Sequence, residues 1–100
     1  MNKLIIDTTD NKKTTIGLRV GQKLDKITRD AKPKSQTTLL IIDQLIKRNK
    51  LRPSEIDEIE VNTGPGSFTG TRVGVSIANA LGFGLGVKVN KKSLVTPKYS

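Results

Sequence analysis

The sequence has 100 residues, enough for one small domain with a modest hydrophobic core. Apolar residues make up 34% and aromatic residues 3%, so that core must be built from Ile, Leu and Val. There is no cysteine or histidine, which excludes disulfides, thiolate chemistry and histidine-based catalysis and removes the two ligands that zinc prefers. A net charge of +9 is typical of proteins that bind nucleic acid, although a lysine-rich chain with solvated surfaces has the same composition.

The first part of the chain predicts three strands in an antiparallel meander. Residues 3–7 are a short apolar run that ends in a polar residue, typical of a buried strand. Residues 14–20 alternate apolar and polar side chains and should pair with the first strand. A two-residue turn, Gly21-Gln22, then leads into a third strand over residues 23–29, whose pattern is weaker.

A helix follows the polar connection of residues 30–34. Ser35 is the expected N-cap, and the helix should end near Lys50. Its apolar positions are too many for one narrow stripe, so the helix should bury two sides. These positions are Leu39, Leu40, Ile41, Ile42, Leu45 and Ile46. The linker after it is expected to hold one helical turn at Pro53.

A strand and a glycine-rich turn come next. Residues 58–62 alternate and predict a strand. In the turn after it, Gly64 and Gly66 are free to take positive φ on either side of Pro65. Ser67 and Thr69 can cap the exposed amides of the helix that follows.

This second helix should run from about residue 70 to about residue 86 and carries almost no charge. Small residues at every fourth position form a smooth stripe that another backbone can approach closely. The stripe consists of Gly70, Gly74, Ala78, Gly82 and Gly86. Residues 87–89 begin a further strand, and the residues after Asn90 form a tail. The order β-β-β-α-β-α-β predicts an α/β fold with helices packed on a mixed sheet.

The sequence predicts no membrane segment. The uncharged run of residues 73–87 is about 15 residues long, below the roughly 20 that a spanning helix needs. The N-terminus enters an apolar run too short for a signal peptide. We therefore expect a cytoplasmic protein.

The glycine turn is the first candidate for chemistry, because a glycine-rich loop before a helix can bind phosphate through its free amides. The spacing departs from both usual templates: the dinucleotide fingerprint needs glycine where Thr69 stands, and the triphosphate loop needs Lys after Gly70. A tight turn that seats the helix is the plainer interpretation. The candidate phosphate or nucleotide residues are Asp7, Gly64, Gly66, Ser67, Thr69 and Gly70.

A small phosphate-transferring or hydrolytic enzyme would have to use this loop together with Asp7. The sequence offers no clear second carboxylate beside Asp7 and no full set of metal ligands. We therefore predict no catalytic residue, no metal site and no cofactor.

The two helices are the second candidate, because together they carry more apolar surface than one side of a small sheet covers. They either pack on each other or bind a partner protein, and we favour the partner. The expected interface residues are Leu39, Ile42, Leu45, Ile46, Gly70, Gly74, Ala78 and Gly82.

Four stretches of the sequence resemble one known family. Residues 61–74, VNTGPGSFTGTRVG, resemble the GPGSFTG-x-R-[IV]-G segment of TsaB, the bacterial tRNA threonylcarbamoyladenosine biosynthesis proteins with a Gcp-like domain. Residues 5–9 are similar to the family's opening strand and turn, and residues 35–46 to its first helix. Residues 85–87, with Ser93 and Leu94, are similar to a later segment. The resemblance implies the first lobe of the actin, Hsp70 and sugar-kinase fold, which is RNase H-like.

The resemblance also implies a role. TsaB is the non-catalytic partner of a TsaD-like enzyme, which places a threonylcarbamoyl group on N6 of adenosine 37 in tRNA. A TsaE-like ATPase would join through that complex, and tRNA would bind indirectly, with Lys12, Lys13, Lys23 and Lys26 as candidate contacts. A homodimer through the same helices and a degenerate, non-functional lobe remain alternatives.

Two departures from the family stand out. Lys34 replaces the histidine that precedes Ser-Gln in the family's first helix. Family members are also roughly twice as long, with a second lobe. We expect residues 1–90 to form the first lobe and residues 91–100 to form a tail or the start of a missing second lobe.

Overall fold

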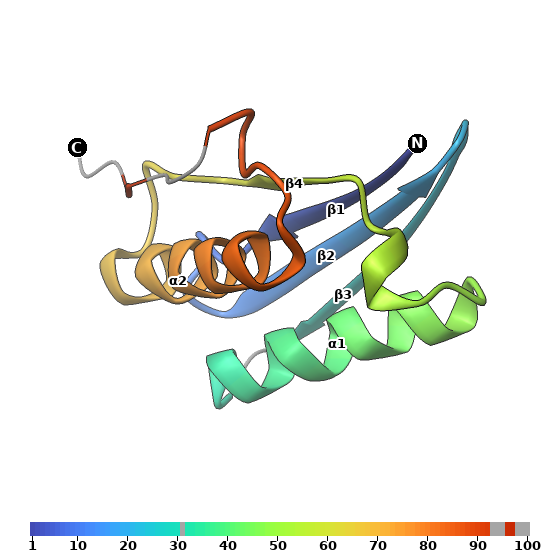
Figure 1. The fold of residues 1–100 in the computed structure, drawn as a ribbon. Coiled ribbons are helices and arrows are strands. Elements are labelled where there is room, and N and C mark those ends of the chain that lie inside the picture. Colours follow the sequence, from blue (N-terminus) through green and yellow to red (C-terminus); the bar gives the residue numbers. More distant parts are fainter. Residues whose placement is uncertain (31, 93–95, 98–100) are drawn as a thin grey trace.

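The computed structural model describes residues 1–30, 32–92 and 96–97. Its strands are β1 (Asn2–Asp7), β2 (Lys13–Val20), β3 (Lys23–Asp30) and β4 (Glu58–Val61). Its helices are α1 (Lys34–Arg48) and α2 (Phe68–Leu85), with a short 3-10 turn, η1, over Pro53–Glu55. Figure 1 shows one sheet with both long helices lying along it.

The sheet has the order β3-β2-β1-β4. Antiparallel pairing joins β1 to β2 and β2 to β3, and Gly21 takes φ 63° in the turn before β3, so the predicted meander is confirmed. β4 lies parallel to β1, with Ile6 opposite Val61. This parallel pairing brings the end of β1 and the glycine turn after β4 to the same edge of the sheet (Figure 1).

The predicted last strand is reduced to one bridge. Val89 forms a single parallel bridge with Ile59, and the chain then turns back so that Val89 pairs with Lys92. Asn90 and Lys91 have φ of 50° and 64°, the left-handed values of a two-residue hairpin turn. The Asn90 side chain takes the place of the strand: its oxygen accepts from the Val61 amide at 2.8 Å, and its nitrogen donates to the Val61 carbonyl at 3.0 Å.

Both helices pack on the same face of the sheet, α1 against β2 and β3, and α2 against β4 and β1. Even-numbered residues of β1 and β2 point toward them, including Leu4, Ile6, Ile16 and Leu18, all almost fully buried. The rest of the core includes Ile41, Ile42, Leu45, Ile46, Ile56, Ile59, Val61, Val75, Ala78 and Val89. The fold therefore has two layers, as the element order predicted.

The helix boundaries correct one predicted cap and confirm the other. α1 begins at Lys34, so Ser35 lies inside its first turn; Pro33 occupies the cap position and makes no side-chain cap bond to a described residue. α2 begins at Phe68, and the Ser67 hydroxyl accepts from the Gly70 amide at 3.2 Å. Gly86 ends α2 with φ 70°, a left-handed conformation that glycine adopts without strain.

Candidate functional site

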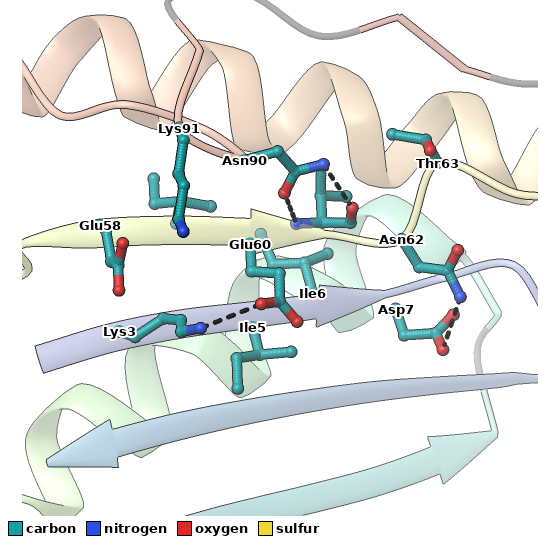
Figure 2. A pocket seen from close by; sticks show the side chains of 12 residues that line it. Lys3, Ile5, Ile6, Asp7, Glu58, Glu60, Asn62, Thr63, Asn90 and Lys91 are labelled. Atoms are coloured by element: carbon teal, nitrogen blue, oxygen red, sulfur yellow. Dashed lines mark hydrogen bonds and ion pairs between the residues drawn. The ribbon is translucent and has the colours of Figure 1, made fainter.

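The predicted loop residues gather where β1 ends. Asp7 is the last residue of β1, and its Oδ1 accepts from the Thr9 amide at 3.0 Å and from the Thr9 hydroxyl at 2.7 Å. Its Oδ2 accepts from the Asn62 side chain at 3.2 Å (Figure 2). Burial alone would raise the pKa of Asp7, but these hydrogen bonds together hold the pKa below its ordinary value. Asp7 is therefore an ionised group that organises the loops.

The glycine turn packs directly on the segment after β1. The Ser67 amide donates to the Thr9 carbonyl at 2.7 Å. A Cβ on Gly66 would lie 2.6 Å from the Thr9 Cβ, and one on Gly70 would collide with the Thr8 carbonyl. The Thr8 hydroxyl in turn donates to the Gly70 carbonyl at 2.6 Å. These glycines are needed because two backbone segments touch, which favours the interpretation as a tight turn that seats α2.

Three of the loop amides already have acceptors within the chain. Gly64 donates to the Asn62 side chain, Ser67 to Thr9, and Gly70 to the Ser67 hydroxyl. A phosphate could take these amides only if the loop rearranged. Thr69 lies exposed in the first turn of α2. Phosphate binding here stays a prediction.

Sequence reasoning missed the structural role of Lys34. Its ammonium donates to the Asp10 carbonyl at 2.6 Å and to the Lys13 carbonyl at 3.3 Å, which ties the start of α1 to the turn between β1 and β2. Burial lowers the pKa of Lys34, against the nearby carboxylates of Asp10 and Asp7. The replacement of the family's histidine at this position was the only signal in the sequence.

The outer face of the two helices carries a shallow apolar groove. One part, about 340 Å³, is lined by Leu39 of α1 and by Ser76, Ile77, Ala80 and Leu81 of α2. A second part of the same size lies nearer the helix starts, between Ser35 of α1 and a row on α2 made of Phe68, Thr69, Arg72, Val73 and Ser76. Leu39 and Phe68 are 50% and 55% exposed. The Arg72 guanidinium lies over the Phe68 ring, 5.4 Å from its centroid.

Most residues of the predicted interface are not on this surface. Ile42, Leu45 and Ile46 belong to the core, where α1 meets the sheet and α2. The small-residue stripe also faces inward: Gly74 abuts Thr8, Gly82 lies against Val89, and Gly70 and Ala78 are buried. Of the eight predicted residues, only Leu39 is exposed. The chain's own Thr8 and Val89 already pack against the stripe, and contact of these residues with a partner stays a prediction.

The face of the sheet away from the helices holds a third hollow, of about 500 Å³. Figure 2 shows its lining side chains along β1 and β4, with the Lys3 ammonium 3.0 Å from a Glu60 carboxylate oxygen. Glu58 and Lys91 also line it. Among the described residues, no group of three carboxylate, histidine or cysteine side chains could hold a metal ion.

The candidate tRNA contacts are separated by the fold. Lys12 and Lys13 lie where the chain enters β2, whereas Lys23 begins β3 at the opposite end of the sheet. Lys26 pairs with Gly17 in the middle of β3. The four lysines thus form no single patch. Of the helices that the structure describes, none is long and apolar enough to cross a bilayer.

Comparison with known proteins places this geometry in a family. The profile described as "TsaD: tRNA N6-adenosine threonylcarbamoyltransferase" matches residues 16–91. The tRNA threonylcarbamoyladenosine biosynthesis protein TsaB of Haemophilus influenzae is 41% identical over 51 residues, covering 51% of this chain and 22% of that protein. The TsaB protein of Bacillus subtilis is 29% identical over 97 residues, covering 93% of this chain and 41% of that protein.

A solved structure, YeaZ from Pseudomonas aeruginosa, superposes with a TM-score of 0.83 at 24% identity. The superposition covers 88% of this chain and 41% of YeaZ. The chain therefore spans less than half the length of these relatives. The predicted single RNase H-like α/β lobe is confirmed. The part of the resemblance at Ser93 and Leu94 lies outside the described residues.

Proposed function

The chain belongs to the family of TsaD, the tRNA N6-adenosine threonylcarbamoyltransferase, and resembles its TsaB members. We propose that it takes part in threonylcarbamoyladenosine (t6A) biosynthesis as a partner subunit. In this role it binds a TsaD-like protein and stabilises its active conformation. We assign the binding to residues 1–90 as one lobe, with residues 91–100 as a tail or the beginning of a second lobe. The TsaD-like protein, and not this chain, carries the transfer chemistry.

One observation carries the partner role: the apolar groove between α1 and α2 is exposed, although the core beneath it is complete. Two large apolar side chains that line it, Leu39 and Phe68, are 50% and 55% exposed. Single exposed apolar residues are common, but two adjoining apolar hollows that share Ser76 favour a protein interface. No acidic residue lines either part of the groove. A helix of the partner, laid along the groove, would bury these side chains.

The residues that the structure describes hold no group of carboxylate, histidine or cysteine side chains that could bind a metal ion, which supports a non-catalytic role. The sequence has neither histidine nor cysteine, and the Asp7 carboxylate is engaged with Thr9 and Asn62. Asp7 is also ionised, with a lowered pKa, whereas a general acid or base works best with a pKa near neutrality. The geometry therefore favours a binding subunit over a small hydrolase.

Co-purification with the TsaD-like protein of the same organism tests the proposal. The variant Leu39→Glu places a carboxylate in the groove and should lower affinity at least tenfold, because an unpaired charge in an apolar interface costs more than about 1.4 kcal/mol. The matched control is Leu24→Glu, the same substitution at a leucine that is 42% exposed on β3, away from the helices. Circular dichroism should show both variants folded.

Each outcome is informative. Loss of the complex with Leu39→Glu alone supports the groove as the interface. Equal affinity for both variants would overturn the proposed surface, and no complex with the unmodified chain would overturn the partner role. Self-association lost with Leu39→Glu, without any TsaD complex, would point to a homodimer. The substitution Gly74→Leu is unsuitable as a test, because Gly74 packs on Thr8 inside the chain.

A further inference from the structure

Arg72 is the one charged residue among the described residues that line the groove between α1 and α2. It is exposed and lies in the second turn of α2, beside the part of the groove nearer the helix starts. The rest of that part is formed by three hydroxyl side chains and two apolar ones. These are Ser35, Thr69 and Ser76, with Phe68 and Val73. One positive charge therefore stands at one end of an otherwise uncharged groove.

The two helices offer Arg72 no free carboxylate. α2 contains no Asp or Glu, so the positions three and four residues from Arg72, where a helix can supply an ion pair, are not acidic. In α1 the only carboxylate is Asp43, and it already lies 3.0 Å from the Lys47 ammonium. Among the described residues Arg72 forms no salt bridge, whereas Arg48 and Arg52 each pair with a carboxylate. The charge of Arg72 is thus not neutralised within the part of the chain that the structure describes.

Contact with Phe68 fixes where this charge lies. The Arg72 guanidinium stands 5.4 Å from the centroid of the Phe68 ring, and both residues line the same hollow. A guanidinium packed over a ring uses its face, which leaves its N–H edges as donors, and two of these can bond a carboxylate in parallel. The stack also reduces the conformational freedom that the long arginine side chain loses on binding. Arg72 is therefore arranged in advance to receive a carboxylate.

The surroundings of Arg72 also favour a negative ligand. Figure 1 shows that α1 and α2 start at the same end of the molecule, and neither has an acidic residue in its first turn. The positive ends of both helix dipoles therefore lie beside this part of the groove. Ser35 and Thr69, near those helix starts, add hydroxyl donors. These contributions reinforce Arg72 and are not by themselves a site.

We propose that Arg72 binds a carboxylate of the partner helix that lies in the groove, an inference that rests on the proposed partner role. When a protein covers the groove, water is removed from Arg72, and a desolvated charge without a counter-charge weakens a complex severely. An acidic side chain of the partner at this point removes that cost and fixes the direction in which its helix lies. The other end of the groove is apolar, with Ala80 about 12 Å, or two turns, from Arg72. The partner helix should therefore carry an Asp or Glu about two turns from large apolar side chains.

Surface plasmon resonance with the TsaD-like protein of the same organism, at several salt concentrations, tests this assignment on the full chain. Arg72→Glu should lower affinity at least tenfold, because two negative groups then face each other. Arg72→Met keeps an unbranched side chain beside Phe68 but no charge, and should lower affinity about fivefold and flatten the salt dependence. The matched controls are Arg19→Glu and Arg19→Met. Arg19 is an exposed arginine of β2 opposite Lys3, on the sheet face away from the helices, and both controls should stay within about twofold.

A charge swap identifies the ligand. Partner variants in which one exposed Asp or Glu is replaced by Lys are measured against the unmodified chain and against Arg72→Glu. One of them should bind Arg72→Glu at least tenfold more tightly than the unmodified partner does, and should bind the unmodified chain less tightly. Failure of every such variant to restore binding would overturn the carboxylate assignment.

The outcomes separate this inference from the partner role. If Leu39→Glu abolishes the complex while Arg72→Glu and Arg72→Met bind as the unmodified chain does, the groove stays the interface and the charge contact is refuted. Equal losses for substitutions at Arg72 and at Arg19 would also refute it, because net charge alone would explain them. No complex with the unmodified chain would overturn the partner role itself, and this inference with it. Circular dichroism should show all variants folded, since both arginines are exposed.

Discussion

Adding one methyl group to Gly74 or to Gly84 should have opposite effects, although both glycines lie in α2. A Cβ on Gly74 would lie 3.3 Å from the Thr8 Cβ and 3.4 Å from its Cγ2, and closer still to the hydroxyl. A Cβ on Gly84 meets nothing within 4 Å. In both variants alanine gains helix propensity, worth about 1 kcal/mol or less near a helix end. Only Gly74→Ala must also displace Thr8.

The magnitude follows from three contributions. Overpacking costs about 1–3 kcal/mol, and losing the Thr8 bond to the Gly70 carbonyl costs about 1 kcal/mol. After the propensity gain, Gly74→Ala should lower the free energy of unfolding by about 2 kcal/mol, whereas Gly84→Ala should raise it by up to about 1 kcal/mol. For a domain of this size, a change of about 2 kcal/mol corresponds to a fall in Tm of about 8–16 °C.

Urea and thermal unfolding followed by circular dichroism measure both variants. A double-mutant cycle adds the mechanism: with Thr8→Ala in place the clashing hydroxyl is gone, so Gly74→Ala should cost at least about 1 kcal/mol less. Equal stabilities of the Gly74→Ala and Gly84→Ala proteins would refute the inward-facing stripe. In that case the small residues of α2 would again be candidates for a partner surface.

Two further predictions concern polar contacts. Hydrogen bonds from Arg48 and then Asn49 lower the pKa of Asp25 below 3.8, so the native state gains stability above that pH and loses it as pH falls through the lowered pKa. Acid unfolding of Asp25→Asn should therefore show a shallower loss of stability below about pH 4, and an unchanged acid limb would contradict this sign. Asn90→Gly keeps the left-handed turn but loses both bonds to Val61, and urea unfolding should show a loss of about 1–2 kcal/mol. Asn90→Ala should lose more, because alanine resists a φ of 50°; a smaller loss in the alanine variant would argue against the turn geometry.

The local elements were predictable because their signals are local. Alternating apolar residues in β2, the Gly21-Gln22 turn and the Ser67 cap each depend on a few neighbouring residues, and the structure has them all. The motif of residues 61–74 likewise identified the family before any contact was known, and the family profile confirms it. The predicted cap of α1 was wrong by two residues, since Pro33 holds the cap position and the helix begins at Lys34, which places Ser35 inside its first turn.

What the tertiary structure alone decided is which surface each pattern uses. A stripe of small residues permits a close approach, but only the position of Thr8, more than sixty residues earlier in the chain, shows that the approach is made by the segment directly after β1. Whether residues 87–89 continue as a strand depended on Asn90, whose amide fills the strand's place beside Val61. Sequence patterns fix the local conformation and the number of apolar faces. The partner of each face is set by contacts between segments distant in sequence, because burial is decided by all of the packed elements together.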